Sequence, residues 1–310
     1  MEKMLEAGLA EAAVLADPSP EMLTDAKRHA ADAVVVGSLD EMLALGLDGI
    51  VIATPSALHA EQSIAALQGG SAVFCQKPLG RDATEARAVV DAARKADRLL
   101  GLDLSYRHTE GAQRIKDAVR ADRLGRVFAA DLMFHNAYGP GKPWFFDKAL
   151  SGGGCVIDLG VHLVDLVLWL LDFPDVVDVR SNLFAGGKPL PPGGDVVEDY
   201  AVVTMTLADD VVVRIACSWR ISAGCDAVIR AELYGTGGGA ALRNVQGSFY
   251  DFTADHFAGT SATRLSEGPD DWGGRAAAAW VRQLARSPAF DPQADEFVRS
   301  ADVLDRIYGR

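Results

Sequence analysis

The stretch Gly152-Gly-Gly-Cys-Val-Ile-Asp158-Leu-Gly-Val-His162-Leu-Val-Asp165 sets three ionisable side chains into an apolar run that continues to Leu171. On a helix, positions i, i+4 and i+7 share a face, so Asp158, His162 and Asp165 would line one side. Burying ionisable groups is costly unless they are paired or take part in chemistry. The stretch therefore predicts a buried helix over 155–171 that forms one wall of an active site.

Two other interpretations of this helix stay open. A buried Asp–His pair can be purely structural, and Asp-x3-His-x2-Asp also offers side chains that bind zinc. No further cluster of His or Cys lies nearby in the sequence, which disfavours a metal site. A membrane span is excluded because the apolar run has only about 16 residues, under the roughly 20 needed, and is broken by ionisable groups.

The composition indicates an ordinary globular protein without a nucleic-acid or membrane surface. A chain of 310 residues predicts about two domains. The net charge of −13 argues against nucleic acid and anionic membranes as partners. Met1–Gly8 is charged and has no long apolar core, so no signal peptide is expected there. Four scattered cysteines without a C-x-x-C pair make disulfides unexpected and fit a cytoplasmic location, namely Cys75, Cys155, Cys217 and Cys225.

Residues 1–104 alternate short β-type runs with helical patterns. This alternation is typical of βαβ units and predicts a Rossmann-type, doubly wound parallel sheet with helices on both faces. Met1–Gly8 is expected to be the remainder of a first helix. The expected strands are 12–16, 33–36, 49–53, 72–75 and 99–104, and the expected helices are 21–31, 39–45, 57–68 and 82–96.

Residues 105–310 follow another pattern, in which β-rich segments are separated by Gly, Pro and Asp turns. Such a succession predicts an α/β domain with a large, open, mostly antiparallel sheet. The expected strands are 127–134, 175–184, 199–207, 211–219 and 227–234, and the expected helices are 111–122, 155–171, 273–286 and 292–308.

Polar groups end two of the early strands, where ligands of open parallel sheets bind. Asp17 follows the first expected strand and is placed to hold the adenine ribose hydroxyls, although it could equally be a turn or helix-capping residue. Thr54 and Pro55 follow a later strand. The glycine fingerprint should precede Asp17 by about 20 residues, which falls before Met1. We therefore expect a truncated chain or a start codon assigned too late, and a sheet split by the missing first strand and G-x-G-x-x-G loop.

Gln76-Lys77-Pro78 follows the expected strand 72–75. Pro78 prevents continued ladder pairing, so the chain must turn there. A lysine at that sheet edge can reach a substrate oxygen, but an exposed lysine with no such role remains the alternative for Lys77.

Together these pieces resemble the Gfo/Idh/MocA family, named for glucose–fructose oxidoreductase and inositol dehydrogenase. Their spacing and order agree over nearly the whole chain. The resemblance implies a Rossmann domain followed by an α/β domain with a large, open sheet, through which family members commonly form dimers or tetramers. The matching segments are Ala16-Asp17-Pro18, Val51-Ile-Ala-Thr54-Pro55 with His59, Gln76-Lys77-Pro78, Gly152–Gly154, and Asp158-Leu-Gly-Val-His162 with Asp165.

The resemblance also implies an activity: hydride transfer between NAD or NADP and a carbinol of a sugar, polyol or related compound. Lys77 would contact the reacting oxygen, His162 would transfer the proton, and Asp158 would be its partner. Two departures are Gln76, where the family usually has glutamate, and the missing glycine loop. They leave open a second function, a sensor or regulator without turnover.

The substrate pocket is expected between the two domains, with NAD favoured because Asp17 would repel the extra phosphate of NADP. Thr54, Pro55, His59 and Gln76 are expected near the cofactor, with a capping or packing role for His59 as the alternative. Arg107 could instead form a hinge salt bridge, and Trp144 could merely pack its loop. The expected substrate-binding residues are Tyr106, Arg107, His135, Asn136 and Trp144.

Overall fold

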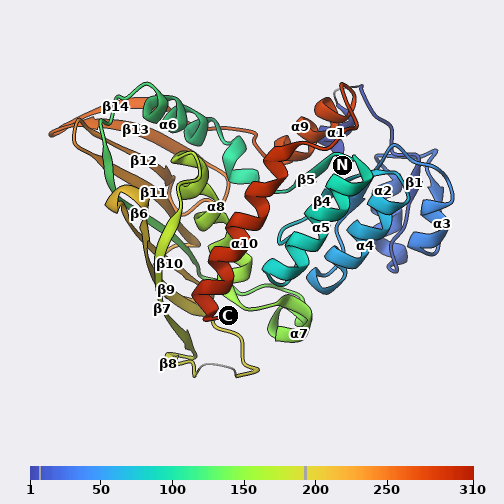
Figure 1. Cartoon of the computed structure of the whole chain (residues 1–310), viewed down its shortest axis with the longest axis horizontal. Helices are drawn as coiled ribbons and strands as arrows, with labels where there is room; N and C mark the ends of the chain where they lie inside the picture. Colours follow the sequence, from blue (N-terminus) through green and yellow to red (C-terminus); the bar gives the residue numbers. More distant parts are fainter. Residues whose placement is uncertain (7, 192–193) are drawn as a thin grey trace.

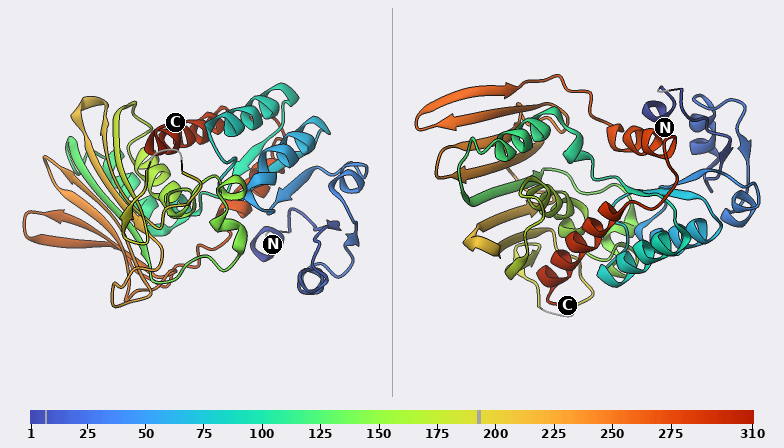
Figure 2. Two further views of the ribbon diagram at one scale, coloured as in Figure 1. Left: turned by 90° about the horizontal axis from the view of Figure 1, so that it is seen from below. Right: turned by 45° about the horizontal axis from the view of Figure 1, so that its top comes forward.

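The computed structural model describes residues 1–6, 8–191 and 194–310, so Ala7 of the expected first helix lies outside the described residues. Figures 1 and 2 show two halves side by side, one built on short parallel strands and the other on a large curved sheet. The expected α/β fold class is confirmed.

The N-terminal half contains a three-stranded parallel sheet in the order β3-β4-β5. Parallel neighbours need crossover connections, which α4 and α5 provide. α5 begins where the Asp82 side chain accepts a hydrogen bond from the Glu85 amide, an N-cap. The bounds are β3 (Gly49–Ile52), α4 (Ser56–Gln68), β4 (Ala72–Cys75), α5 (Ala83–Ala96) and β5 (Leu100–Leu102).

The expected split of this sheet is confirmed. β1 and β2 pair in parallel with each other and form a separate two-stranded sheet. The apolar side chains along this split are about half exposed: Val34 at 57% and Val35 at 46% on β2, and Val51 at 46% on β3. The first elements are α1 (Glu2–Leu5), β1 (Val14–Leu15), α2 (Pro20–Lys27), β2 (Val34–Val35) and α3 (Leu39–Leu43).

The second half is a nine-stranded sheet in the order β14-β13-β12-β11-β6-β10-β9-β7-β8. All neighbours are antiparallel except β6 and β10, which confirms the mostly antiparallel sheet. β8 and β12–β14 were not expected from the sequence. The strands are β6 (Val127–Asn136), β7 (Val176–Ala185), β8 (Lys188–Pro189), β9 (Tyr200–Leu207), β10 (Val212–Ser218), β11 (Ala227–Gly235), β12 (Gly239–Asn244), β13 (Phe252–Ala258) and β14 (Ser261–Ser266).

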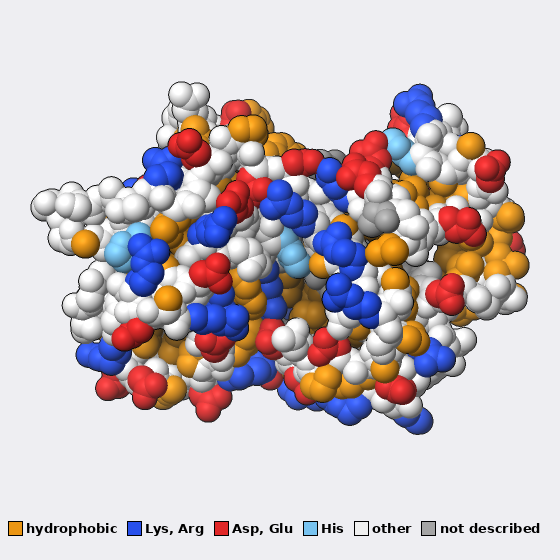
Figure 3. Space-filling view, turned by 90° about the horizontal axis from the view of Figure 1, so that it is seen from above, with side chains coloured by type: hydrophobic (Ala, Val, Ile, Leu, Met, Phe, Trp, Pro, Cys, Tyr) orange, Lys and Arg blue, Asp and Glu red, His pale blue; other side chains and the backbone are white. Residues whose placement is uncertain are grey.

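Helices α6 (Glu110–Arg120), α8 (Val161–Leu170) and α10 (Asp295–Tyr308) pack on one face of this sheet (Figure 1). The helical segment Lys148–Leu170, which starts with α7 (Lys148–Ser151), is long and apolar enough to cross a membrane by composition alone. It is mostly buried within the protein, as expected of a core helix. Figure 3 shows acidic and basic side chains interspersed over the face seen from above.

Helix α9 (Arg275–Leu284) returns to the N-terminal half. Its Trp280 packs against Phe74 of β4, with ring centroids 5.7 Å apart. Gly49 and Gly101 make room for this ring, since a Cβ at either position would lie 2.6 Å from it. The domain boundary near residue 104 stays a prediction. α9, from the last part of the chain, shares a hydrophobic core with β4 of the N-terminal half.

Candidate active site

The glycine triplet at 152–154 allows close packing between segments. Gly152 has φ +86°, which favours glycine. A Cβ on Gly153 would lie 2.1 Å from the Tyr308 hydroxyl, and one on Gly154 would lie 1.9 Å from the carbonyl oxygen of Glu198. These positions therefore bring the start of the buried helical segment against the loop before β9 and against the C-terminal helix.

Glu198, which the sequence reasoning missed, anchors the start of this segment. Its buried carboxylate accepts hydrogen bonds from the amides of Gly154 (3.0 Å) and Val156 (2.8 Å) and from the Tyr308 hydroxyl (2.7 Å). Burial raises the pKa of Glu198, although these hydrogen bonds oppose the shift. An anion suits the free amides at a helix start. No sequence signal links Glu198 to residues more than 40 positions earlier.

Asp158 lies in a five-residue π-helical turn, η3 (Val156–Gly160), that leads into α8. π-turns are rare and frequent at functional sites. The Lys77 ammonium donates to the Asp158 carbonyl oxygen at 2.7 Å and to Oδ1 at 2.6 Å, while Trp219 Nε1 donates to Oδ2 at 3.0 Å. Burial opposes ionisation of Asp158, but the Lys77 charge and these hydrogen bonds outweigh it and lower its pKa.

His162 lies on α8, four residues after Asp158, and is half-buried. Its ring packs edge-on against Tyr106, with centroids 5.0 Å apart, and among the described residues its buried Nδ1 has no hydrogen-bond partner. Burial, helped by the Lys77 charge, lowers the pKa of His162 to about 3. Among the described residues Asp158 binds Lys77 and Trp219 and makes no hydrogen bond to His162, so the partnership expected of Asp158 and His162 stays a prediction.

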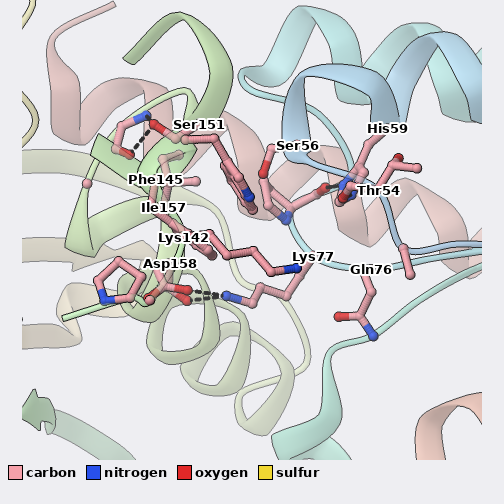
Figure 4. A pocket seen from close by; sticks show the side chains of 17 residues that line it. Thr54, Ser56, His59, Gln76, Lys77, Lys142, Phe145, Ser151, Ile157 and Asp158 are labelled. Carbon is pink, nitrogen blue, oxygen red and sulfur yellow. Dashed lines mark hydrogen bonds and ion pairs between the residues drawn. The ribbon is translucent and has the colours of Figure 1, made fainter. Parts of the chain in front are cut away.

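A cavity of about 520 Å³ lies where the two halves meet, as expected. Lys77 and Asp158 form part of its wall, and Figure 4 shows them joined by hydrogen bonds. Lys142, on the loop after β6, also lines the cavity and was missed, since an exposed loop lysine carries no sequence signal. The lining residues include Thr54, Ser56, His59, Gln76, Lys77, Pro78, Lys142, Trp144, Phe145, Ser151, Ile157 and Asp158.

His59 links the two strand-end loops of the N-terminal half. Its ring nitrogens lie 2.6 Å from the carbonyl oxygens of Thr54 and Pro78, and its side chain is buried. Burial lowers the pKa of His59 despite these contacts. The Thr54 hydroxyl donates to Gln62 at 2.7 Å. His59 thus has the packing role that was its alternative, and it also lines the cavity.

Arg107 forms the hinge salt bridge that was its alternative. Its guanidinium Nε donates to Asp165 Oδ2 at 2.7 Å, and its Nη1 donates to Glu296 Oε2 at 2.6 Å. Asp165 also accepts from Ser300 at 3.3 Å. These groups join α8 to α10. Arg107 is not among the residues that line the cavity, and the substrate contact expected of it stays a prediction. Asp165 likewise contacts a different partner from Asp158, and the two carboxylates do not share a ligand site.

The other expected substrate residues divide into two groups. Trp144 lines the cavity and stacks on Phe145, with centroids 3.8 Å apart. His135 Nδ1 lies 2.7 Å from the Ser218 hydroxyl, and Asn136 accepts from the Tyr138 amide. Both are therefore engaged within the sheet and do not line this cavity. Tyr106 is buried and supports the ring of His162.

Asp17 follows β1 and is exposed. Its Oδ1 accepts from the Ser19 amide at 2.7 Å, just before Ser19 caps α2. The turn role that stood as its alternative is present, and the second carboxylate oxygen remains available for the ribose contact. That contact stays a prediction.

The ends of the parallel strands in the N-terminal half meet a lysine–aspartate pair across a cleft, an arrangement suited to a nucleotide and a small polar ligand. The chain belongs to the GFO/IDH/MocA oxidoreductase family. Residues 2–104 match the family model described as "Oxidoreductase family, NAD-binding Rossmann fold", and residues 112–241 match the GFO/IDH/MocA C-terminal domain.

Several relatives are named as sugar or inositol dehydrogenases and reductases. The chain is 30% identical over 233 residues to 1,5-anhydro-D-fructose reductase of Ensifer adhaerens, a match that spans 72% of this chain and 67% of the relative. It is 32% identical over 144 residues to D-glucoside 3-dehydrogenase of Escherichia coli K12, spanning 46% of this chain but only 41% of that relative.

Two solved structures are similar over nearly the whole chain. GenD2 from gentamicin A biosynthesis, in complex with NAD, is 25% identical with a TM-score of 0.77, covering 96% of this chain and 87% of that one. Levoglucosan dehydrogenase with NADH and levoglucosan has a TM-score of 0.81 at 21% identity, covering 99% and 92%. The second likeness establishes the fold.

Proposed function

We propose that this protein transfers a hydride between a nicotinamide nucleotide and a carbinol of a sugar or polyol. The observation that carries the proposal is the Lys77–Asp158 pair, at 2.6 Å, on the wall of the interdomain cavity. The names of the relatives favour a sugar or cyclic polyol as the substrate class.

The described residues fit the nicotinamide end of such a cofactor. Thr54 follows β3 and Gln76 follows β4, at the carboxyl edge where open parallel sheets bind nucleotides. Asp17 follows β1 and would hold the adenine ribose, which favours NAD. The 310 residues contain no G-x-G-x-x-G motif, so the pyrophosphate end has no such loop within them.

Lys77 is the residue that would bind the reacting oxygen. An ammonium has three N–H donors, and Asp158 accepts two of them through its carbonyl and carboxylate oxygens. The third remains for a substrate oxygen, where it would stabilise developing negative charge during oxidation. Trp219 holds Asp158, so the ammonium is positioned before a substrate arrives.

His162 is the proposed proton-transfer residue. Because burial lowers its pKa to about 3, its imidazole is neutral at physiological pH, the form that a proton acceptor needs, but it is a weak base. The same low pKa makes the protonated ring a strong acid, which favours returning the proton during reduction. A bound nicotinamide nucleotide supplies or accepts the hydride.

The outer face of the large sheet is proposed to join copies of the chain into a homodimer or homotetramer. This face carries exposed apolar side chains that alternate with buried ones, as along β10. Small-angle scattering should then give a molecular mass greater than that of a single chain, and Val212→Asp should lower that mass. The supporting residues are Phe128, Val202, Val212 and Tyr234, between 37% and 44% exposed.

A cytoplasmic location is also proposed, because the four cysteines are free thiols, as the reducing cytoplasm favours.

The test titrates NADH into the 310-residue chain while tryptophan fluorescence is followed, and then measures absorbance at the nicotinamide band with a panel of sugars and polyols. We expect saturable quenching and turnover of at least one compound. His162→Asn should lose turnover and keep NADH binding. A chain that binds no nicotinamide nucleotide would overturn the proposal, and binding without turnover would favour the sensor function.

A further inference from the structure

Asp103 lies behind Gln76 at the wall of the cavity. Its amide donates to the Cys75 carbonyl at 2.9 Å, which places the residue after β5 beside the residue after β4. Gln76 Nε2 then donates to Asp103 Oδ2 at 2.6 Å. Across residues 1–6, 8–191 and 194–310 this is the single hydrogen bond to the Asp103 carboxylate, whose other oxygen is buried and unpartnered.

This contact determines which way the Gln76 amide points. A glutamine amide has a donor nitrogen on one side and an acceptor oxygen on the other. With its nitrogen bound to Asp103, the amide must turn its oxygen away from Asp103. Figure 4 shows that oxygen on the side of Lys77 and the nitrogen on the opposite side. Gln76 therefore offers the cavity an acceptor, next to the ammonium donor of Lys77.

We propose that Asp103 is a positioning residue, which orients Gln76 so that its amide oxygen accepts a hydrogen bond from a hydroxyl group bound beside Lys77. The inference rests on the proposed function. A hydroxyl is the group common to a nicotinamide ribose and a polyol substrate, and both would meet the same acceptor. The donor at Lys77 and the acceptor at Gln76 would then recognise two neighbouring oxygens.

In the Gln76–Asp103 pair only Asp103 is charged. The contact can therefore be tested by exchanging the amide and the carboxylate between the two positions. Gln76→Glu would place two carboxylates at the 2.6 Å contact, where they repel unless one is protonated. Asp103→Asn would leave the amide of Gln76 without a partner that requires its nitrogen. The double variant restores one amide and one carboxylate in inverted order, and it again turns an acceptor oxygen toward the cavity.

The experiment measures NADH affinity by fluorescence, and kcat and KM for the best polyol, in these three variants. Asp117→Asn on α6 is the control, since Asp117 is exposed and is not among the residues that line the cavity. We expect Asp103→Asn to lose about tenfold, the effect of one hydrogen bond, and the double variant to recover most of it. Gln76→Glu alone keeps an acceptor toward the cavity and should lose through repulsion from Asp103. A change in NADH affinity identifies the ribose, whereas a raised KM with unchanged affinity and kcat identifies the substrate.

A second readout needs no cofactor. The side-chain amide protons of Gln76 should exchange slowly with water in the wild type and rapidly in Asp103→Asn, by NMR. The inference is overturned if Asp103→Asn matches the wild type in both readouts, or if the double variant is no better than the worse single one. Wild-type protein that binds no NADH would overturn the proposed function instead, while the exchange measurement still decides the orientation of Gln76.

Discussion

Replacing Glu198 by alanine would remove the carboxylate that holds the turn carrying Asp158. The substitution leaves three buried donors without this acceptor: the amides of Gly154 and Val156 and the hydroxyl of Tyr308. Each buried donor left unpaired costs about 1–3 kcal/mol. Burial already disfavours this carboxylate, so part of the loss is recovered, and we expect a net loss of about 3–5 kcal/mol of unfolding free energy.

Glu198→Gln is the matched control for this substitution. Its amide oxygen can still accept from Val156 and Tyr308, while its nitrogen would face the Gly154 amide, which donates to both carboxylate oxygens in the wild type. The expected loss is therefore about 1 kcal/mol. Urea unfolding, followed by circular dichroism and tryptophan fluorescence, measures both variants. If alanine costs no more than glutamine, the hydrogen-bond argument is wrong.

The pH dependence gives this argument a second test. The folded-state pKa of Glu198 is raised, so the folded protein holds this proton more tightly than the unfolded chain does. Its contribution to stability is therefore full below the ordinary pKa and is lost as the pH rises through the folded-state pKa. Glutamine does not titrate. The stability advantage of the wild type over Glu198→Gln should shrink as the pH rises, and an advantage that grows would contradict the sign.

Three further predictions concern the site and its support. Lys77→Met should lower kcat at least about 100-fold while circular dichroism stays unchanged, because Asp158 and the reacting oxygen lose their donor; activity within tenfold of the wild type would contradict this. Gly154→Ala should abolish folding, since the new Cβ would lie 1.9 Å from a backbone oxygen. A Cβ at Gly141 would have no atom within 4 Å, so Gly141→Ala is the control and should keep the wild-type melting temperature. His162 has a lowered folded-state pKa, so the unfolded chain takes up its proton first and stability should fall as the pH drops from about 6.5 toward 3. His162→Gln should flatten that slope in urea titrations, and an unchanged slope would count against a buried neutral imidazole.

The local sequence by itself determined most of the helices and strands, and it identified the buried helical segment that carries Asp158 and His162. Alternation of apolar runs with helical periods predicted the parallel half, because each pattern reflects which face is buried. The helical spacing of Asp158 and His162 predicted one helix, where the structure has the π-turn η3 with Asp158 leading into α8 with His162. Short strands such as β12–β14 escaped prediction because their pairing depends on distant partners rather than on their own composition.

Contacts between distant segments were decided only by the tertiary structure. Lys77 meets Asp158 across 81 positions, and Glu198 reaches back to Gly154 across 44. The sequence could nominate Lys77 and Asp158, since burial demands a partner for each, but it could not say which partner, and it gave no signal for Glu198. Arg107 shows the consequence, because its charge suited a substrate as well as a hinge until Asp165 and Glu296 were found beside it. Side-chain type follows from sequence, whereas pairing follows from how the sheets and helices pack.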